Sequence, residues 1–191
     1  MLYPFFEKIF ISDSFSCRKS KGVHKALNRF RAMAHRLGRN HTRTVWILKC
    51  DIKKFFANVD HGILLEFLDE YIPDRDIVWL LGRVIGSFSL HPHLTSPIKR
   101  EEWEGQGEGV GLPLGNLTSQ LFVNIYMNQF DQFVKHQLKI KNYVRYADDF
   151  AVLSEDKDWL QWILIPIRKF LSGKLALELH EGKIKIATLS S

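Results

Sequence analysis

Two adjacent aspartates, Asp148 and Asp149, interrupt an otherwise apolar stretch, NYVRYADDFAVL (residues 142–153). Residues such as Val144 and Val152 are typical of a half-buried strand, whereas aspartate is depleted in strands. We interpret the stretch as two strands joined in a hairpin with both carboxylates at its tip. A plain Asp-Asp turn is the simpler alternative, and in either case the two charges need a compensating partner.

A third carboxylate follows another predicted strand. The apolar segment VWILKCDIKKFF (45–56) favours a strand that ends on Asp51, and a helix is predicted at 60–72 with Asp60 as its cap. A sheet could place Asp51 beside the hairpin tip. Three clustered carboxylates would stay partly protonated unless a cation neutralised them, and Mg²⁺ prefers such hard oxygen ligands. Two ions about 3.5–4 Å apart can clamp the attacking and leaving oxygens of a phosphoryl transfer. The pattern therefore predicts a two-metal phosphoryl-transfer site.

The remaining segments predict an α+β fold. Apolar residues repeat at helical spacing in 74–88, 117–134 and 158–171, where Pro166 is expected to break or bend the helix. A Pro-, His- and Gly-rich stretch at 90–115 predicts a hairpin or a mobile loop, and two β-like pieces, LALEL and KIKIATL, close the chain. The order resembles a split βαβ layout, an antiparallel sheet with helices on one face.

Composition and charge narrow the class of protein. A chain of 191 residues with 46% hydrophobic and 25% charged residues can bury a core, which excludes disorder. The net charge of +6 favours a polyanionic partner. No acid occurs from Arg18 to Arg43, so this run predicts either a phosphate-facing surface or a solvated helix face. The two distant cysteines argue against a zinc site or a disulfide framework, and no signal peptide or membrane span is visible. We therefore expect a cytoplasmic protein without a membrane partner.

Five motifs in order resemble the reverse transcriptases of the bacterial group that includes group II intron and diversity-generating retroelement enzymes. They are DSFSCRKSKGVHKAL, LKCDIKKFFANVDH, GLPLGNLTSQLFVNIYMNQFDQFV, YVRYADDFAVL and LELHEGKIKI. A lone YxDD would be weak evidence, whereas five motifs over nearly the whole chain are specific. The resemblance implies an RNA-directed DNA polymerase with a right-hand palm and partial fingers. The block LGNLTSQ is similar to the diversity-generating branch, whose enzymes copy template RNA with errors at adenines.

The resemblance also implies a division of the chain. Residues 1–44 would be partial fingers with a basic arm, 45–71 the first part of the palm, 72–113 fingers or a connecting hairpin, and 114–191 the second part of the palm. The chain would start within the fingers and stop before the thumb. We therefore expect a core fragment that is weakly active or inactive without the missing parts.

Carried over residue by residue, the resemblance implies that Asp51, Asp148 and Asp149 hold two Mg²⁺ ions, with Mn²⁺ as an alternative. The main-chain carbonyl of Ile52 would be an added ligand. Lys183 matches the lysine that approaches the departing pyrophosphate, where an ammonium can stabilise charge or supply a proton. A solvated strand lysine remains the alternative for this residue.

The same resemblance assigns residues to the incoming nucleotide. The main chain of Lys54 and Phe55 would meet the triphosphate, and Phe56 would stack under the deoxyribose and clash with a 2′-hydroxyl. Strand alternation would send these two aromatic rings to opposite faces, so one of them is expected in the core. Leu114 replaces the glutamine of accurate relatives and cannot hydrogen-bond, which predicts low fidelity. Gly115 would permit close approach of the backbone, or would cap a helix.

Further residues are assigned to nucleotide, template or primer. They are Gln120 for the nucleotide and Arg18, Lys19, Lys21, Lys25, Asn116 and Tyr146 for nucleic acid. Asn116 and Gln120 could instead cap the helix that they open, and Tyr146 could be a plain strand aromatic. The expected partners are an RNA template, a DNA or RNA primer and deoxynucleotides. A basic face could also serve an accessory protein subunit.

Two other function classes stay open at this point. The first is a relative of reverse transcriptases that binds RNA or acts in phage defence without polymerising. The second is a metal-dependent phosphodiesterase, for which His180 is the late candidate to position water.

Overall fold

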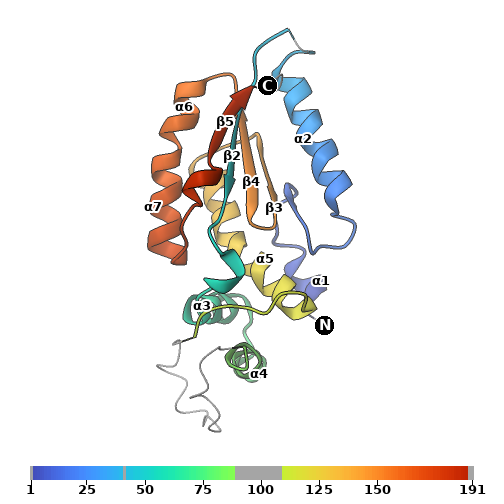
Figure 1. Cartoon of the computed structure of the whole chain (residues 1–191). Helices are drawn as coiled ribbons and strands as arrows, with labels where there is room; N and C mark the ends of the chain where they lie inside the picture. The colour runs from blue at the N-terminus through green and yellow to red at the C-terminus, as the bar shows by residue number, and fades with distance from the viewer. Residues whose placement is uncertain (1, 41, 89–108, 189–191) are drawn as a thin grey trace. The chain divides into compact units, whose positions relative to one another are not determined.

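The computed structural model describes residues 2–40, 42–88 and 109–188 (Figure 1). The chain forms two compact units, which we call the sheet unit (Met1–Lys53 with Met127–Ser191) and the helical unit (Lys54–Tyr126). The predicted first segment, residues 1–44, belongs to the same unit as the strands of the predicted palm. The assignment of segments to fingers and palm stays a prediction.

The sheet unit is built on five strands in the order β1-β3-β4-β2-β5. Their bounds are β1 Ser14–Phe15, β2 Trp46–Asp51, β3 Tyr143–Tyr146, β4 Asp149–Ser154 and β5 Lys185–Thr188. Neighbouring strands run antiparallel, except that β1 and β3 pair in parallel at one edge. The α+β class and the mostly antiparallel sheet are confirmed, and the parallel edge pair is an addition that the sequence pattern did not predict.

Side-chain alternation along β4 gives the sheet two different faces. On one face the Phe150 ring meets the Phe130 ring edge-on, with 5.1 Å between centroids. On the other face Leu153 joins a buried cluster with Met33, and Ala151 packs against the cluster that contains Phe15 and Ala26. Each face therefore has its own apolar core.

Helices cover both faces of the sheet in the sheet unit (Figure 1). The bounds are α1 Tyr3–Phe6, α2 Val23–Leu37, α6 Lys157–Trp162 and α7 Leu164–Leu175, with α5 Leu117–Gln132 entering this unit at Met127 and continuing as a π-helical turn, Phe133–Gln137. The end of α5, α6 and α7 lie on one face (Figure 1), so the expectation of helices on a single face holds for these elements only. The basic helix α2 lies over part of the opposite face, because its apolar stripe of Ala26, Phe30 and Met33 packs there.

The predicted break near Pro166 is present between α6 and α7. The helix ends at Trp162 and resumes at Leu164. Proline in a helix clashes with the carbonyl four residues earlier, which here belongs to Trp162. The proline ring therefore explains why the helix is interrupted directly after Trp162.

The helical unit contains the two helices predicted between residues 60 and 88. They are α3 His61–Tyr71 and α4 Arg75–Gly86. The expected cap is confirmed, since Asp60 Oδ1 accepts a hydrogen bond of 2.9 Å from the Ile63 N–H. Within this unit the Phe67 and Tyr126 rings pack edge-on at 5.7 Å.

Three other expectations have different outcomes. The predicted strand LALEL is wrong, because α7 runs to Leu175 and Ala176 takes a left-handed conformation with φ of 48°; the segment keeps a single bridge, Ile52 with Leu179. The hairpin or loop expected at 90–115 falls largely outside the described residues. Among the described helices, none is long and apolar enough to span a bilayer.

Candidate active site

The three aspartates lie at one end of the central strands. Asp51 is the last residue of β2 and pairs in register with Asp149, the first residue of β4. Asp148 lies in the turn between β3 and β4, after Ala147, whose φ of 54° is left-handed. The predicted hairpin with carboxylates at its tip is therefore confirmed, as is the strand that carries Asp51 to the same edge.

Two lysines face these carboxylates. Lys183 Nζ lies 3.0 Å from Asp51 Oδ2, and Lys49 Nζ lies 3.6 Å from Asp149 Oδ1. Burial raises the pKa of Asp148, and the nearby charges of Asp51 and Asp149 raise it further. The site therefore holds more negative charge than its own lysines neutralise, and an added cation would be stabilised there.

The three carboxylates do not form a complete metal-binding site by themselves. Within the described ranges, no three acidic, histidine or cysteine side chains are grouped closely enough to hold an ion. Sequence reasoning expected a tight cluster of three, whereas Asp51 and Asp149 each turn toward a lysine. Mg²⁺ commonly binds through one or two carboxylates plus waters and substrate phosphates. The hard oxygens of Asp51 and Asp148 fit such a site, with Asp149 beside them.

A buried ion pair supports the hairpin from behind. Arg145 on β3 and Asp131 on α5 are both fully buried, and the guanidinium donates to both carboxylate oxygens at 2.9 and 2.6 Å. The Tyr143 hydroxyl donates to the same carboxylate at 2.6 Å. Arg145 Nη1 also donates to the Ala147 carbonyl at 2.9 Å. The pair therefore fixes the backbone immediately before Asp148.

Tyr146 and Ile52 flank the carboxylates along the chain. Tyr146 ends β3, pairs in register with Asp149 and is partly exposed, with 37% of its surface accessible. Its ring is therefore free to meet a ligand, unlike a buried strand aromatic. Ile52 is buried and bridges Leu179, which fixes the backbone just after Asp51.

The aromatic pair predicted for the nucleotide belongs to the helical unit. Phe55 is buried and Phe56 is half-buried, so Phe55 is the ring in the core and Phe56 stays accessible, in agreement with its assignment to the deoxyribose. The expected reason, strand alternation, is wrong, because these residues form a 3₁₀ turn that follows Lys54 in a left-handed conformation. The two rings meet edge-on at 5.6 Å.

The LGNLTSQ block opens α5 in the same unit. Leu114 is 78% exposed, and Gly115 has a φ of 82°, which favours glycine. Asn116 Oδ1 accepts a 2.9 Å hydrogen bond from the Thr118 N–H, so it acts as a helix cap. The Gln120 N–H donates to the Asn116 carbonyl, and its side chain is half-buried.

The predicted basic arm divides into a structural and an accessible part. The Arg18 side chain is 3% exposed and donates to Glu7, the Ile11 carbonyl and Ser14. The prediction that Arg18 contacts nucleic acid is therefore corrected, because its N–H donors are already used inside the protein. The accessible part forms a basic recess, lined by Lys19, Lys21, Lys25, Asn28 and Arg29 among others.

The floor of the basic recess carries one acid. Asp13 is buried and accepts from Arg29 at 2.6 Å and from Lys135 at 2.8 Å. Burial alone would raise the pKa of Asp13, but the hydrogen bonds from Arg29 and Lys135 outweigh it and hold the pKa below its usual value. Asp13 is therefore ionised and paired with Arg29 and Lys135, whereas Lys19 and Lys25 are exposed at the recess and can meet a ligand.

Comparison with known proteins decides the family. The family model described as "Reverse transcriptase (RNA-dependent DNA polymerase)" matches residues 1–190. The chain belongs to the reverse transcriptase family. Reverse transcriptases depend in general on a divalent metal ion, in agreement with the donor types found at this site.

Bacterial relatives of this reverse transcriptase chain include a group II intron protein. Protein YkfC of Escherichia coli (strain K12) is 26% identical, over 96% of this chain and 53% of that protein. The group II intron-encoded protein LtrA of Lactococcus lactis subsp. cremoris is 23% identical, over 97% of this chain and 39% of that protein. The chain therefore spans about half the length of these relatives or less.

Solved structures show the same fold. The telomerase from Candida tropicalis in complex with a TWJ fragment of telomeric RNA aligns with a TM-score of 0.62 at 14% identity, over 94% of this chain and 30% of that chain. The apo telomerase from the same organism aligns with a TM-score of 0.61. At this identity the likeness supports the reverse transcriptase fold alone.

Sequence reasoning about this reverse transcriptase missed three residues that shape the site. They are Lys49, Asp131 and Arg145. A signal for the buried pair exists, since Arg145 interrupts an apolar strand and Asp131 interrupts an apolar helix stripe. Buried charges are almost always paired, so each should have suggested the other. Lys49 carries no such signal, because an exposed strand lysine is ordinary.

Proposed function

We propose that this chain carries the polymerase core of an RNA-directed DNA polymerase, which adds deoxynucleotides to a primer 3′ end along an RNA template. The observation that carries the proposal is the convergence of Asp51, Asp148 and Asp149 at one end of the central strands. The family assignment supports it. A cytoplasmic location, favoured by the composition, belongs to the same proposal.

The proposed chemistry assigns roles to the residues of the sheet unit. Asp51, Asp148 and Asp149, with the Ile52 carbonyl, would hold two Mg²⁺ ions, or Mn²⁺ in their place. When bound, the ions would supply stabilisation of the charge that develops on the transferred phosphoryl group. The Lys183 ammonium would donate to the departing pyrophosphate, since it already lies 3.0 Å from a carboxylate of the site.

The remaining roles concern substrate placement. Tyr146 would contact the primer end. The main chain of Lys54 and Phe55 would bind the triphosphate, because N–H groups of an irregular backbone can cradle anionic oxygens. Phe56 would stack under the deoxyribose and exclude a ribonucleotide, and its partial exposure supports this role.

We further propose that the enzyme is error-prone and of the diversity-generating retroelement type. Leu114 stands where a glutamine would hydrogen-bond the nucleotide or its surroundings, so Leu114→Gln is expected to lower the error rate about fivefold, the effect of one hydrogen bond worth about 1 kcal/mol. Sequencing of the copied DNA measures the rate, with errors opposite template adenines scored separately. Leu117→Gln is a matched control, because Leu117 is 81% exposed and Leu114 is 78% exposed. Equal error rates in wild type and Leu114→Gln would contradict the assignment.

The basic recess is proposed to bind the phosphates of the template. Lys25→Gln should reduce the slope of log affinity against log salt concentration by about 0.7 on single-stranded RNA, because one phosphate contact is lost. Filter binding over a salt series measures the slope. Lys174→Gln on α7 removes the same charge from another exposed position and should leave the slope unchanged. Equal slopes for both variants would mean that only the net charge of the protein matters. The basic recess would then not be part of the RNA-binding surface.

Primer extension on an RNA template with Mg²⁺ and four deoxynucleotides tests the function itself. Extension of the primer supports the polymerase proposal. RNA binding without extension would instead favour the non-polymerising, RNA-binding class. Cleavage of labelled RNA without added nucleotides would favour the phosphodiesterase class. Primer extension that occurs only after a cell extract is added would indicate an accessory subunit.

A further inference from the structure

The 3₁₀ turn Glu181–Lys183 presents Lys183 to the candidate active site. The Lys183 side chain is 56% exposed and reaches Asp51 through a single hydrogen bond of 3.0 Å. Gly182 precedes it, and glycine leaves the backbone unusually free. A long side chain on such a turn would sample many positions unless the turn itself were held. The structure holds the turn on two sides.

The first side is β2. The His180 N–H donates to the Asp51 carbonyl at 2.8 Å, and the Lys183 N–H donates to the His180 carbonyl at 2.8 Å. Two residues before His180, the Glu178 carbonyl accepts a hydrogen bond of 2.9 Å from the Lys53 N–H. These main-chain bonds fix the approach to the turn, and they tie it to the residue that carries the catalytic carboxylate.

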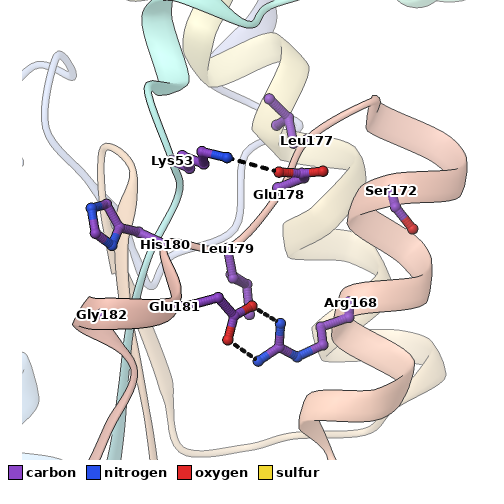
Figure 2. Close-up of a pocket in the computed structure, with 9 residues that line it drawn as sticks. All are labelled: Lys53, Arg168, Ser172, Leu177, Glu178, Leu179, His180, Glu181 and Gly182. Carbon is purple, nitrogen blue, oxygen red and sulfur yellow. Dashed lines mark hydrogen bonds and ion pairs between the residues drawn. The ribbon is translucent and has the colours of Figure 1, made fainter.

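The second side is α7. Arg168 and Glu181 both line a pocket between α7 and the turn, and the Arg168 guanidinium forms two parallel hydrogen bonds with the Glu181 carboxylate (Figure 2). The Nη2–Oε2 distance is 2.9 Å. The hydrogen bonds from Arg168 hold the pKa of Glu181 below its usual value, so the pair is ionised at neutral pH. A bidentate pair restricts direction as well as distance, because the guanidinium and the carboxylate are both planar.

We propose that Arg168 and Glu181 are positioning residues that hold the Glu181–Lys183 turn so that Lys183 points at the catalytic carboxylates. The inference rests on the proposed function, in which Lys183 acts on the departing pyrophosphate. The pair is 42% and 70% exposed, and exposed ion pairs add little to folding stability. Its loss should therefore disturb the site without unfolding the protein.

Single-turnover nucleotide addition tests this role. Arg168→Met and Glu181→Gln should each lower the rate at saturating deoxynucleotide roughly tenfold, since a small misplacement of a catalytic group is costly. The double variant should lose no more than either single variant. In a Lys183→Met background, Arg168→Met should cause no further loss. A further tenfold loss in that background would overturn the proposal, because the pair would then act through some other group.

The matched control is a second ion pair on the same segment. Lys53 Nζ lies 3.3 Å from Glu178 Oε2, and the two side chains are 52% and 71% exposed (Figure 2). Glu178→Gln removes the same type of charge three residues before Glu181, and it leaves the Arg168 bond in place. It should leave the rate unchanged. A loss equal to that of Glu181→Gln would overturn the proposal.

Amide hydrogen exchange gives a readout that does not depend on activity. In Arg168→Met, the amides of His180 and Lys183 should exchange at least about fivefold faster at an unchanged melting temperature, whereas Glu178→Gln should leave them unchanged. Exchange rates that do not move in Arg168→Met would overturn the positioning role, whether or not the chain polymerises. Faster exchange with an unchanged rate of extension would overturn its connection to catalysis. Absence of extension by the wild type would count against the proposed function, and the exchange experiment would still decide whether the pair fixes the turn.

Discussion

Asp148→Asn is expected to lower primer extension by at least about 10²–10³-fold, the loss typical when one group that stabilises transition-state charge is removed from an active site. Asparagine keeps the shape of the side chain but loses the negative charge that would hold a metal ion. The stability of the Asp148→Asn variant should not decrease, although its activity does. Burial, together with the charges of Asp51 and Asp149, raises the pKa of Asp148, so ionising this carboxyl costs more free energy in the folded state than in the unfolded state. The free energy of unfolding of the variant should therefore equal or exceed that of the wild type.

The control for this experiment is Asp158→Asn. Asp158 is an exposed residue in the first turn of α6, and its substitution makes the same change in charge and shape away from the carboxylates. Extension should be unaffected in this variant. Extension by Asp148→Asn at more than about a tenth of the wild-type rate would contradict the assignment of Asp148 to the metal site.

Asp131→Asn is expected to destabilise the sheet unit by about 3–5 kcal/mol, because it leaves the buried Arg145 charge without a counter-charge. The measurement is urea denaturation followed by circular dichroism. Burial raises the pKa of Tyr143 well above its usual value, so its hydroxyl stays protonated and cannot supply the missing charge. A loss below about 1 kcal/mol would show that the pair is not buried as the structure describes.

A double variant separates stability from function at the same pair. Replacement of both partners by apolar residues of similar volume, Arg145→Met with Asp131→Leu, should recover most of the lost stability, because no charge remains buried. Extension should stay low in the double variant, since the hydrogen bond from Arg145 to the Ala147 carbonyl is gone and the turn before Asp148 is released. Full recovery of both properties would show that the pair has no role in placing the hairpin.

Local patterns were sufficient for the elements that carry the site. The strand ending on Asp51, the hairpin of residues 143–154, the Asp60 cap and the break before Pro166 all follow from residues within a few positions of one another. Each depends on short-range chemistry, such as alternation, capping or the missing proline N–H. The five motifs added the family, which the comparisons confirm.

Other features depend on pairs that lie far apart in the chain. Arg18 belongs to an acid-free basic run, yet its partner Glu7 turns it into a buried structural residue. The segment LALEL has the composition of a strand, but α7 extends to Leu175 and leaves it a single bridge to β2. The orientation of Asp51 depends on Lys183, a residue more than a hundred positions later. No local pattern encodes these choices.

The residue types and their order are thus enough to predict the chemistry that we propose for this protein. Carboxylates at strand ends repel one another, and this repulsion points to a cation without any knowledge of the fold. The sheet then decided which cations the carboxylates meet, because register places Asp51 opposite Asp149 and packing brings Lys183 and Lys49 beside them. Strand pairing and burial bring together residues that are distant in the chain, and their free energy depends on the whole arrangement. For this reason only the tertiary structure showed which residues support the hairpin and toward which lysine a carboxylate turns.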